Sequence, residues 1–168
     1  MSVKDGRRAR RETRPGGGAA GVAWPALPDE GIYVLLVRVP EARVVEVGAL
    51  GRLDFKPGFY AYVGRAKRGL RARLARHARG EGKRMRWHID YLLETAVLEE
   101  AWALSLEAGE CETASRLEAG GARRDGLRGF GSSDCRCPGH LLHLGELRPR
   151  APLPMATVIR AWDLGSMG

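Results

Sequence analysis

The chain has 168 residues, of which 44% are hydrophobic and 29% charged, with a formal net charge of +8. This length suits one domain with tails, and no apolar run approaches the ~20 residues of a membrane span, so we expect no membrane partner. Only 4 of the 28 basic Lys and Arg residues are lysine. Arginine binds phosphate bidentately, so this bias indicates a nucleic-acid surface, although charges that merely solvate the protein are the alternative.

The first 29 residues have the composition of a tail. A basic run, Arg7-Arg8-Ala9-Arg10-Arg11, is followed by Pro15-Gly16-Gly17-Gly18, which predicts a disordered basic arm over residues 1–29. The apolar stretch after it is short and contains Pro25, so a twin-arginine export signal fits poorly. The chain has three cysteines, two of them close together, which also disfavours a secreted disulfide scaffold. We therefore expect an intracellular, cytoplasmic protein.

Strands are predicted in the first part of the domain. Residues 31–39 are apolar on both faces, which is typical of a central strand. Residues 43–47 and 59–63 predict two more strands, separated by several Gly and Pro residues. Within the last of these, Tyr60 and Tyr62 should share one face, because side chains alternate along a strand.

A helix is predicted over residues 69–79. Leu70 and Leu74 lie on its buried stripe at 100° per residue. Arg73 and His77 lie along the edge of that stripe, one turn apart. The helix should direct three further arginines to solvent: Arg71, Arg76 and Arg79.

The order of elements predicts an α/β domain of the α+β type over residues 30–148, with a small mixed or antiparallel sheet flanked by helices. Residues 149–168 contain Pro152 and Pro154 and are expected to form an extension that packs weakly. The remaining expected elements are helices at 87–95 and 110–119, strands at 97–106 and 140–147, and a glycine-rich basic loop at 123–133.

Two motifs carry most of the functional information. Gly31-Ile32-Tyr33 opens the first strand, Tyr62-Val63-Gly64 closes another, and an Arg73-x-x-x-His77 step follows on the basic helix. Together they resemble the signature of the GIY-YIG nucleases, and residues 31–147 resemble the Uri-type branch, whose members occur alone or fused to endonuclease III. The resemblance implies one antiparallel sheet in which the two motif tyrosines meet.

The sequence also departs from the GIY-YIG pattern. The tyrosines are 29 positions apart, which is a longer gap than in common members, and we interpret residues 40–56 as an inserted hairpin. The usual terminal asparagine of the family is not evident.

The resemblance implies a metal-dependent endonuclease that hydrolyses phosphodiesters, with DNA favoured over RNA and a role related to repair. It implies Tyr33 as the general base, with Tyr62 and His77 in support and Arg73 on the phosphate. A tyrosine can accept a proton from water only if nearby positive charge lowers its pKa of ~10. We expect the basic surroundings and the metal to do so.

The resemblance further implies a glutamate that holds one Mg²⁺ or Mn²⁺ ion. In the predicted helix at 110–119, Glu110 lies on the same side as Ala114 and Leu117, so it is the preferred ligand. Glu112 points 200° away and is the alternative if the helix begins later. Nucleic-acid-binding candidates near the motifs are Arg65, Lys67, Arg68, Arg71 and Arg76.

A second cluster lies near the end of the domain. Cys135, Cys137, His140 and His143 can be interpreted as a zinc site, with Cys111 as a fifth candidate, although the Cys-x-Cys spacing is tight for a zinc knuckle. Alternatively the cysteines pack as small hydrophobes, or one of them acts as a thiol nucleophile beside a histidine.

Several polar residues are candidates for the nuclease cleft. Ser133, Asp134 and His140 can line it in place of the missing asparagine. His88 and Asp90 either line it or serve as caps at the core edge. The alternatives to an endonuclease are a non-catalytic nucleic-acid-binding module of the same fold and a zinc-stabilised interaction domain.

Overall fold

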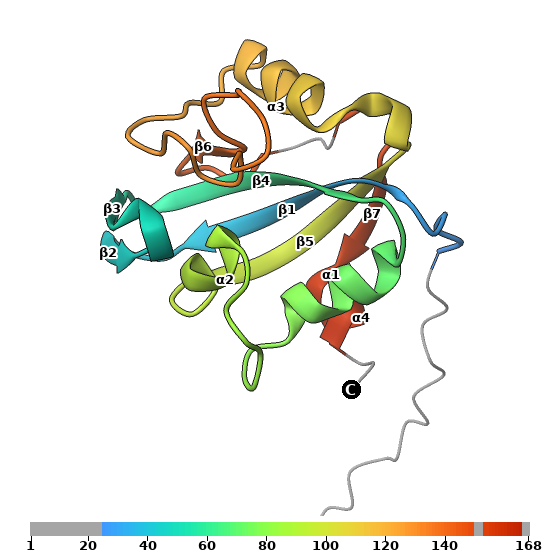
Figure 1. Ribbon diagram of the computed structural model, residues 1–168, viewed down its shortest axis with the longest axis horizontal. Coiled ribbons are helices and arrows are strands. Elements are labelled where there is room, and N and C mark those ends of the chain that lie inside the picture. The colour runs from blue at the N-terminus through green and yellow to red at the C-terminus, as the bar shows by residue number, and fades with distance from the viewer. Residues whose placement is uncertain (1–24, 150–152, 166–168) are drawn as a thin grey trace, which may run out of the picture.

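The protein is described by a computed structural model, which covers residues 25–149 and 153–165. Most of the expected arm at 1–29 lies outside these residues. The described chain forms one five-stranded sheet in the order β6-β4-β1-β5-β7, in which every neighbouring pair is antiparallel (Figure 1). Helices flank this sheet, which confirms the expected α/β fold class. Its strands are β1 (Gly31–Val39), β4 (Gly58–Ala66), β5 (Val97–Leu104), β6 (Leu141–Gly145) and β7 (Thr157–Arg160).

The two faces of the sheet carry different helices. The central strand β1 is buried along nearly its whole length, as its continuous apolar sequence predicts. Tyr33, Tyr60 and Tyr62 belong to the core on one face with residues of α1, α2 and α4, while α3 packs on the other. Tyr60 and Tyr62 therefore share a face, as alternation predicts. The helices are α1 (Leu70–Ala78), α2 (His88–Leu92), α3 (Glu110–Ala119) and α4 (Ala161–Gly165).

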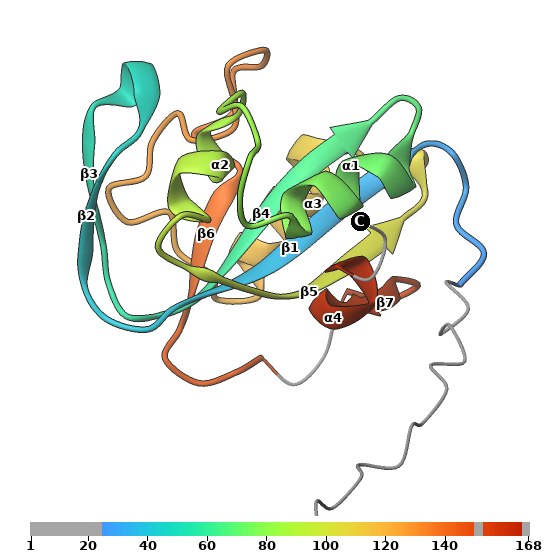
Figure 2. The same ribbon diagram turned by 90° about the horizontal axis from the view of Figure 1, so that it is seen from below.

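The expected insertion between the two motif strands is a separate hairpin. Its strands β2 (Arg43–Glu46) and β3 (Arg52–Phe55) pair with each other and stand at one end of the main sheet (Figure 2). The insertion leaves β1 and β4 paired along their full lengths. Tyr33 lies opposite Gly64, and Tyr62 lies opposite Leu35, so the two motif tyrosines are diagonal neighbours on one face.

The C-terminal segment packs more firmly than expected. β7 pairs with β5 at the edge of the sheet, and the side chains of Ile159 and Leu164 are buried. The prolines that suggested a loose extension precede a β-branched run, Thr157-Val158-Ile159, which forms the strand. The sheet thus extends beyond residue 148. None of the helices among the described residues has the length and apolar character needed to cross a membrane.

Candidate functional site

An open cavity of about 460 Å³ lies where β1, β4, α1 and α3 approach one another. Five cationic side chains line it together with only two carboxylates, which makes it suited to an anion. Its lining consists of Tyr33, Tyr62, Gly64, Arg65, Lys67, Arg68, Arg73, Arg86, Trp87, His88, Glu110, Gly131, Ser133 and Asp134.

The two motif tyrosines lie side by side at the floor of the cavity. Their ring centroids are 6.5 Å apart, and both side chains are almost entirely buried. A Cβ atom on Gly64 would lie 2.4 Å from the ring and hydroxyl of Tyr33. The glycine that ends the second motif therefore makes room for the tyrosine of the first.

His77 lies behind Tyr33 and does not line the cavity. Its Nε2 is 3.1 Å from the Tyr33 hydroxyl. Burial lowers the pKa of His77 to about 3, against the opposing effect of Asp90. The imidazole is thus neutral, and its Nδ1 lies 3.8 Å from a carboxylate oxygen of Asp90. This carboxylate favours the proton on Nδ1, so Nε2 accepts a hydrogen bond from the Tyr33 hydroxyl.

The acidity of the tyrosines differs from what the sequence predicted. Burial raises the pKa of Tyr33 to about 12, because the opposing effect of Arg73 is smaller. Burial also raises the pKa of Tyr62 well above its ordinary value. The protein's cations alone therefore do not make either tyrosine a phenolate.

Arg73 approaches the cavity from the first turns of α1. Its guanidinium donates to the backbone carbonyl of Arg65 at 2.8 Å and lies over the Trp87 ring, 4.9 Å from the centroid. Arg86 also lines the cavity and stacks on Trp87 at 5.1 Å. Sequence reasoning missed Arg86 and Trp87, because they precede α2 in a segment without periodicity. The Arg86-Trp87 dipeptide directly before a helix was the only signal.

Arg76 does not have its expected role, whereas Asp90 has the second of its two expected roles, that of a cap at the core edge. Asp90 is completely buried, and both of its oxygens accept from the Arg76 guanidinium at 2.9 and 3.0 Å. The backbone N–H groups of Arg86 and Trp87 donate to the same carboxylate. These hydrogen bonds outweigh burial and lower the pKa of Asp90. Asp90 is thus a cap of α2 rather than a cleft residue, and Arg76 is committed to it rather than to nucleic acid.

Some of the other predicted cations and carboxylates line the cavity, and some lie outside it. Arg65, Lys67 and Arg68 line the cavity, whereas Arg71 is exposed on α1 outside it. Glu110 lines the cavity from the first turn of α3. Glu112 is exposed on another face of the helix, where it pairs with Arg116, and it does not line this cavity.

The remaining cleft candidates occupy different positions. Ser133 and Asp134 are exposed residues of the cavity lining. His88 also lines it, and its Nδ1 accepts from the backbone N–H of Gly131 at 3.0 Å. His140 is fully buried and does not line the cavity, but its Nδ1 lies 3.3 Å from Oε1 of Glu110.

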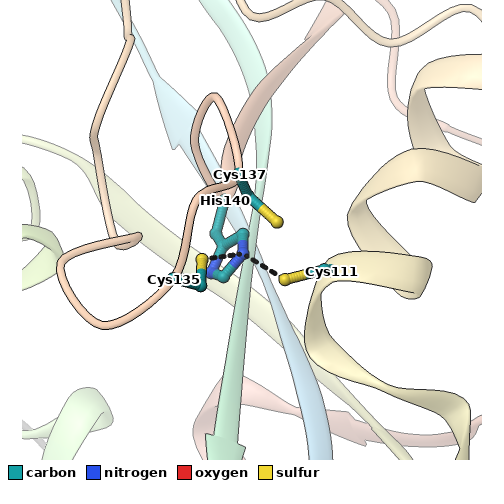
Figure 3. Close-up of side chains that lie close together, drawn as sticks. All are labelled: Cys111, Cys135, Cys137 and His140. Carbon is teal, nitrogen blue, oxygen red and sulfur yellow. Dashed lines mark hydrogen bonds between the residues drawn. The ribbon is translucent and has the colours of Figure 1, made fainter.

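A cluster of thiols and imidazole lies next to Glu110 (Figure 3). One ligand atom from each of Cys111, Cys135, Cys137 and His140 lies within 4.8 Å of all the others, and this set can hold a metal ion. His140 Nε2 is 3.6 Å from both the Cys111 and Cys135 sulfurs. All three cysteines are free thiols. Hydrogen bonding to Cys137, together with burial, raises the pKa of Cys111 to about 12.

His143 does not belong to this cluster. Its Nε2 lies 3.1 Å from the carbonyl oxygen of Pro57, and its ring stacks on Tyr60 at 4.7 Å. His143 lies in β6, three residues beyond His140, where strand alternation directs it away from the cysteines. The predicted zinc ligand His143 is therefore wrong, and Cys111 at the start of α3 takes its place.

Three comparisons relate the chain to known proteins. No curated protein and no solved structure matches it. A family model described as "Domain of unknown function DUF123" matches residues 32–159. This match runs from β1 into β7 and includes every cavity and cluster residue named above. The chain therefore belongs to the DUF123 family.

Proposed function

We propose that the protein is an endonuclease that hydrolyses nucleic-acid phosphodiesters at the cavity between β1, β4, α1 and α3. The observation that carries this proposal is the convergence of Tyr33, Tyr62, Arg73 and Glu110, from four different elements, on one basic cavity. The resemblance of the two tyrosine motifs to GIY-YIG nucleases supports the same reaction and favours DNA as the substrate.

The cations of the cavity supply the electrostatic part of the reaction. Hydrolysis of a phosphodiester places extra negative charge on the phosphate oxygens in the transition state. Arg73 is held against Trp87 and the Arg65 carbonyl, so its fork is oriented before the phosphate arrives. A preoriented charge costs little reorganisation during the reaction, which is the main source of such stabilisation.

The proton path runs through Tyr33. Its hydroxyl donates to neutral His77 Nε2, which leaves an oxygen lone pair for a water in the cavity. As water attacks phosphorus, one water proton moves to the Tyr33 oxygen and the hydroxyl proton moves to His77 Nε2, where the Asp90 carboxylate 3.8 Å from Nδ1 stabilises the transient imidazolium. The P–O bond to the leaving oxygen breaks, and that oxygen takes a proton from solvent water. This coupling avoids a free phenolate, which the raised pKa of Tyr33 disfavours.

The cavity lining contains oxygen donors of the kind that a hard divalent cation prefers. Glu110, Asp134 and the Ser133 hydroxyl offer oxygen donors at the cavity wall, and Mg²⁺ and Mn²⁺ are bound by one or two carboxylates together with water and substrate phosphate. When bound, such a cation stabilises negative charge on the phosphate and on the leaving oxygen. Glu110 is the residue that we propose holds it.

The test is cleavage of labelled plain, nicked and branched DNA, and of matched RNA, in the presence of Mg²⁺ or Mn²⁺. Tyr33→Phe removes the proton relay and should lower the rate by about 10²- to 10⁴-fold. Glu110→Gln should abolish the cleavage that Mg²⁺ or Mn²⁺ supports. The matched control is Tyr60→Phe, since Tyr60 shares the face and the strand of Tyr62 but donates to the Lys56 carbonyl outside the cavity.

Two results would contradict the proposal. Equal cleavage by wild type and Tyr33→Phe would assign the activity to a contaminant. Salt-sensitive binding without cleavage of any substrate would favour a non-catalytic nucleic-acid-binding module. The raised pKa values of both tyrosines are compatible with such a function, because binding needs no proton transfer.

A further inference from the structure

We propose that Cys111, Cys135, Cys137 and His140 bind one Zn²⁺ ion, which fastens the loop between α3 and β6 to the first turn of α3. The four residues come from two segments more than twenty positions apart, and their ligand atoms converge within 4.8 Å (Figure 3). This site lies beside the nuclease cavity but shares none of its lining residues.

The distances fit tetrahedral zinc. Zinc lies ~2.3 Å from a thiolate sulfur and ~2.0 Å from an imidazole nitrogen, and a tetrahedral angle then places sulfur and nitrogen ~3.6 Å apart. The two separations from His140 Nε2, to Cys111 Sγ and to Cys135 Sγ, are both 3.6 Å. These two separations match a tetrahedral site, and the Cys137 sulfur lies within 4.8 Å of the same ligand atoms.

The donor set determines which ion binds and what it does. Three thiolates and an imidazole select a soft or borderline cation and disfavour Mg²⁺, which prefers oxygen. Four protein ligands fill the tetrahedron and leave no position for water, which is typical of a structural site. The proposed zinc is accordingly distinct from the catalytic cation.

The loop needs such a fastening. Between α3 and β6 it contains no regular helix or strand, and only a few of its side chains, including Leu127 and Phe130, reach the core. Yet it supplies Gly131, Ser133 and Asp134 to the cavity wall. A metal that joins Cys135 and Cys137 to Cys111 would hold this wall in place, since metal binding to a preformed site adds directly to folding free energy.

The proposed zinc site also contacts Glu110 through His140. His140 Nδ1 is buried, makes no hydrogen bond of regular geometry, and has Oε1 of Glu110 3.3 Å away. Histidines that bind a metal through one nitrogen usually donate the other N–H to a carboxylate. Zinc on Nε2 would fix the proton on Nδ1 and so orient Glu110, and this consequence for catalysis rests on the proposed function.

The first experiment measures metal without nucleic acid. Full-length protein purified with a reductant and no chelator should contain about one zinc per chain by elemental analysis. Cys137→Ser should lose it, while the control His143→Gln should keep it. Cobalt titrated into metal-free wild type should give the absorption bands of a tetrahedral thiolate site, a readout that does not depend on any variant folding.

The second experiment uses trypsin. Removal of zinc from the wild type should loosen the backbone around Arg128 and Arg136, two exposed arginines of the loop, and accelerate cleavage there by about tenfold or more. Cleavage after Arg79, which lies outside the loop, should keep its rate.

A third variant separates zinc from catalysis. His140→Cys offers a fourth thiolate, so it should retain zinc but raise the Mg²⁺ concentration required for cleavage by about 10- to 100-fold. Absence of zinc and cobalt binding, or a disulfide among the three cysteines in reduced preparations, would overturn the zinc site. Zinc binding without any nuclease activity would overturn only the proposed function.

Discussion

His77 is the residue whose chemistry departs most from that of a free side chain. It is buried between Tyr33, Trp87 and Asp90, and burial lowers its pKa to about 3. In an unfolded chain a histidine has a pKa near ~6.5. Below that pH the unfolded state binds a proton that the folded state does not, so the free energy of unfolding falls as the pH drops from about 6.5 toward 3.

We expect this single histidine to cost about 2 kcal/mol of stability between pH 7.5 and pH 5. His77→Gln should remove that part of the pH dependence, as measured by denaturant unfolding at both pH values. His143→Gln is the matched control, and it should retain the full slope. An unchanged slope in His77→Gln would show that His77 is protonated in the folded protein.

The helical period predicted which residues of α1 lie near the core, but it did not predict which residues of other elements they contact. The 3.6-residue period placed Arg73 and His77 along the edge of the buried stripe of α1, and in the structure Arg73 is half-buried there while His77 is fully in the core. The same wheel directed Arg76 to solvent, because nothing in α1 reveals that α2 brings a buried carboxylate to that side. The roles of Cys111 and His143 were exchanged for the same reason, since contacts between distant segments follow from the fold and not from spacing.

The cavity depends on the antiparallel pairing of strands β1 and β4. Gly64 lies opposite Tyr33 in this pairing, and the ring of Tyr33 is confined by His77 and Tyr62. Strand pairing thus places a glycine where only a hydrogen atom fits. The triplet Tyr62-Val63-Gly64 is in this sense one structural unit with Tyr33.

Gly64→Ala should therefore disturb the site as well as the fold. Its Cβ would lie 2.4 Å from Tyr33, and relief of such overpacking typically costs about 1–3 kcal/mol. We expect a lower melting temperature and loss of cleavage even at temperatures where the variant stays folded. Gly80→Ala, with no atom within 4 Å of its added Cβ, should leave both unchanged. Full activity in Gly64→Ala would mean that Tyr33 can shift without consequence.

Most elements were predictable because their patterns are local. The apolar run of β1, the alternation in β4 and the stripe of α1 each appear within about ten residues of sequence. β3 was anticipated only as part of a hairpin, and β7 was missed, because its four residues follow two prolines and its pairing partner β5 lies more than fifty residues earlier. Edge strands of this kind are defined by what they pair with more than by their own sequence.

The cationic side chains of the described residues are distributed unevenly over the protein. Arg65, Lys67, Arg68, Arg73 and Arg86 gather around one cavity, whereas Arg38, Arg76 and Arg148 are paired with carboxylates elsewhere. Composition predicted a basic surface but could not say which cations are already neutralised. The ion pairs of the fold make that distinction, and among the described residues none of them involves the five cations that line the cavity.

This distribution predicts which arginines set the salt dependence of binding. Each lost phosphate contact should reduce the slope of log binding constant against log salt by about 1. In a Tyr33→Phe background without divalent ions, where cleavage should be negligible, Arg86→Ala should reduce the slope by that amount. Arg65→Ala combined with Arg68→Ala should reduce it by about twice as much. Fluorescence anisotropy with a labelled duplex measures this slope between 50 and 200 mM salt. Over that range ~6–10 phosphate contacts would change the affinity by ~10³–10⁵. Arg79→Ala removes an exposed arginine outside the cavity, so an equal reduction there would mean that DNA contacts the basic surface at large and not this cavity.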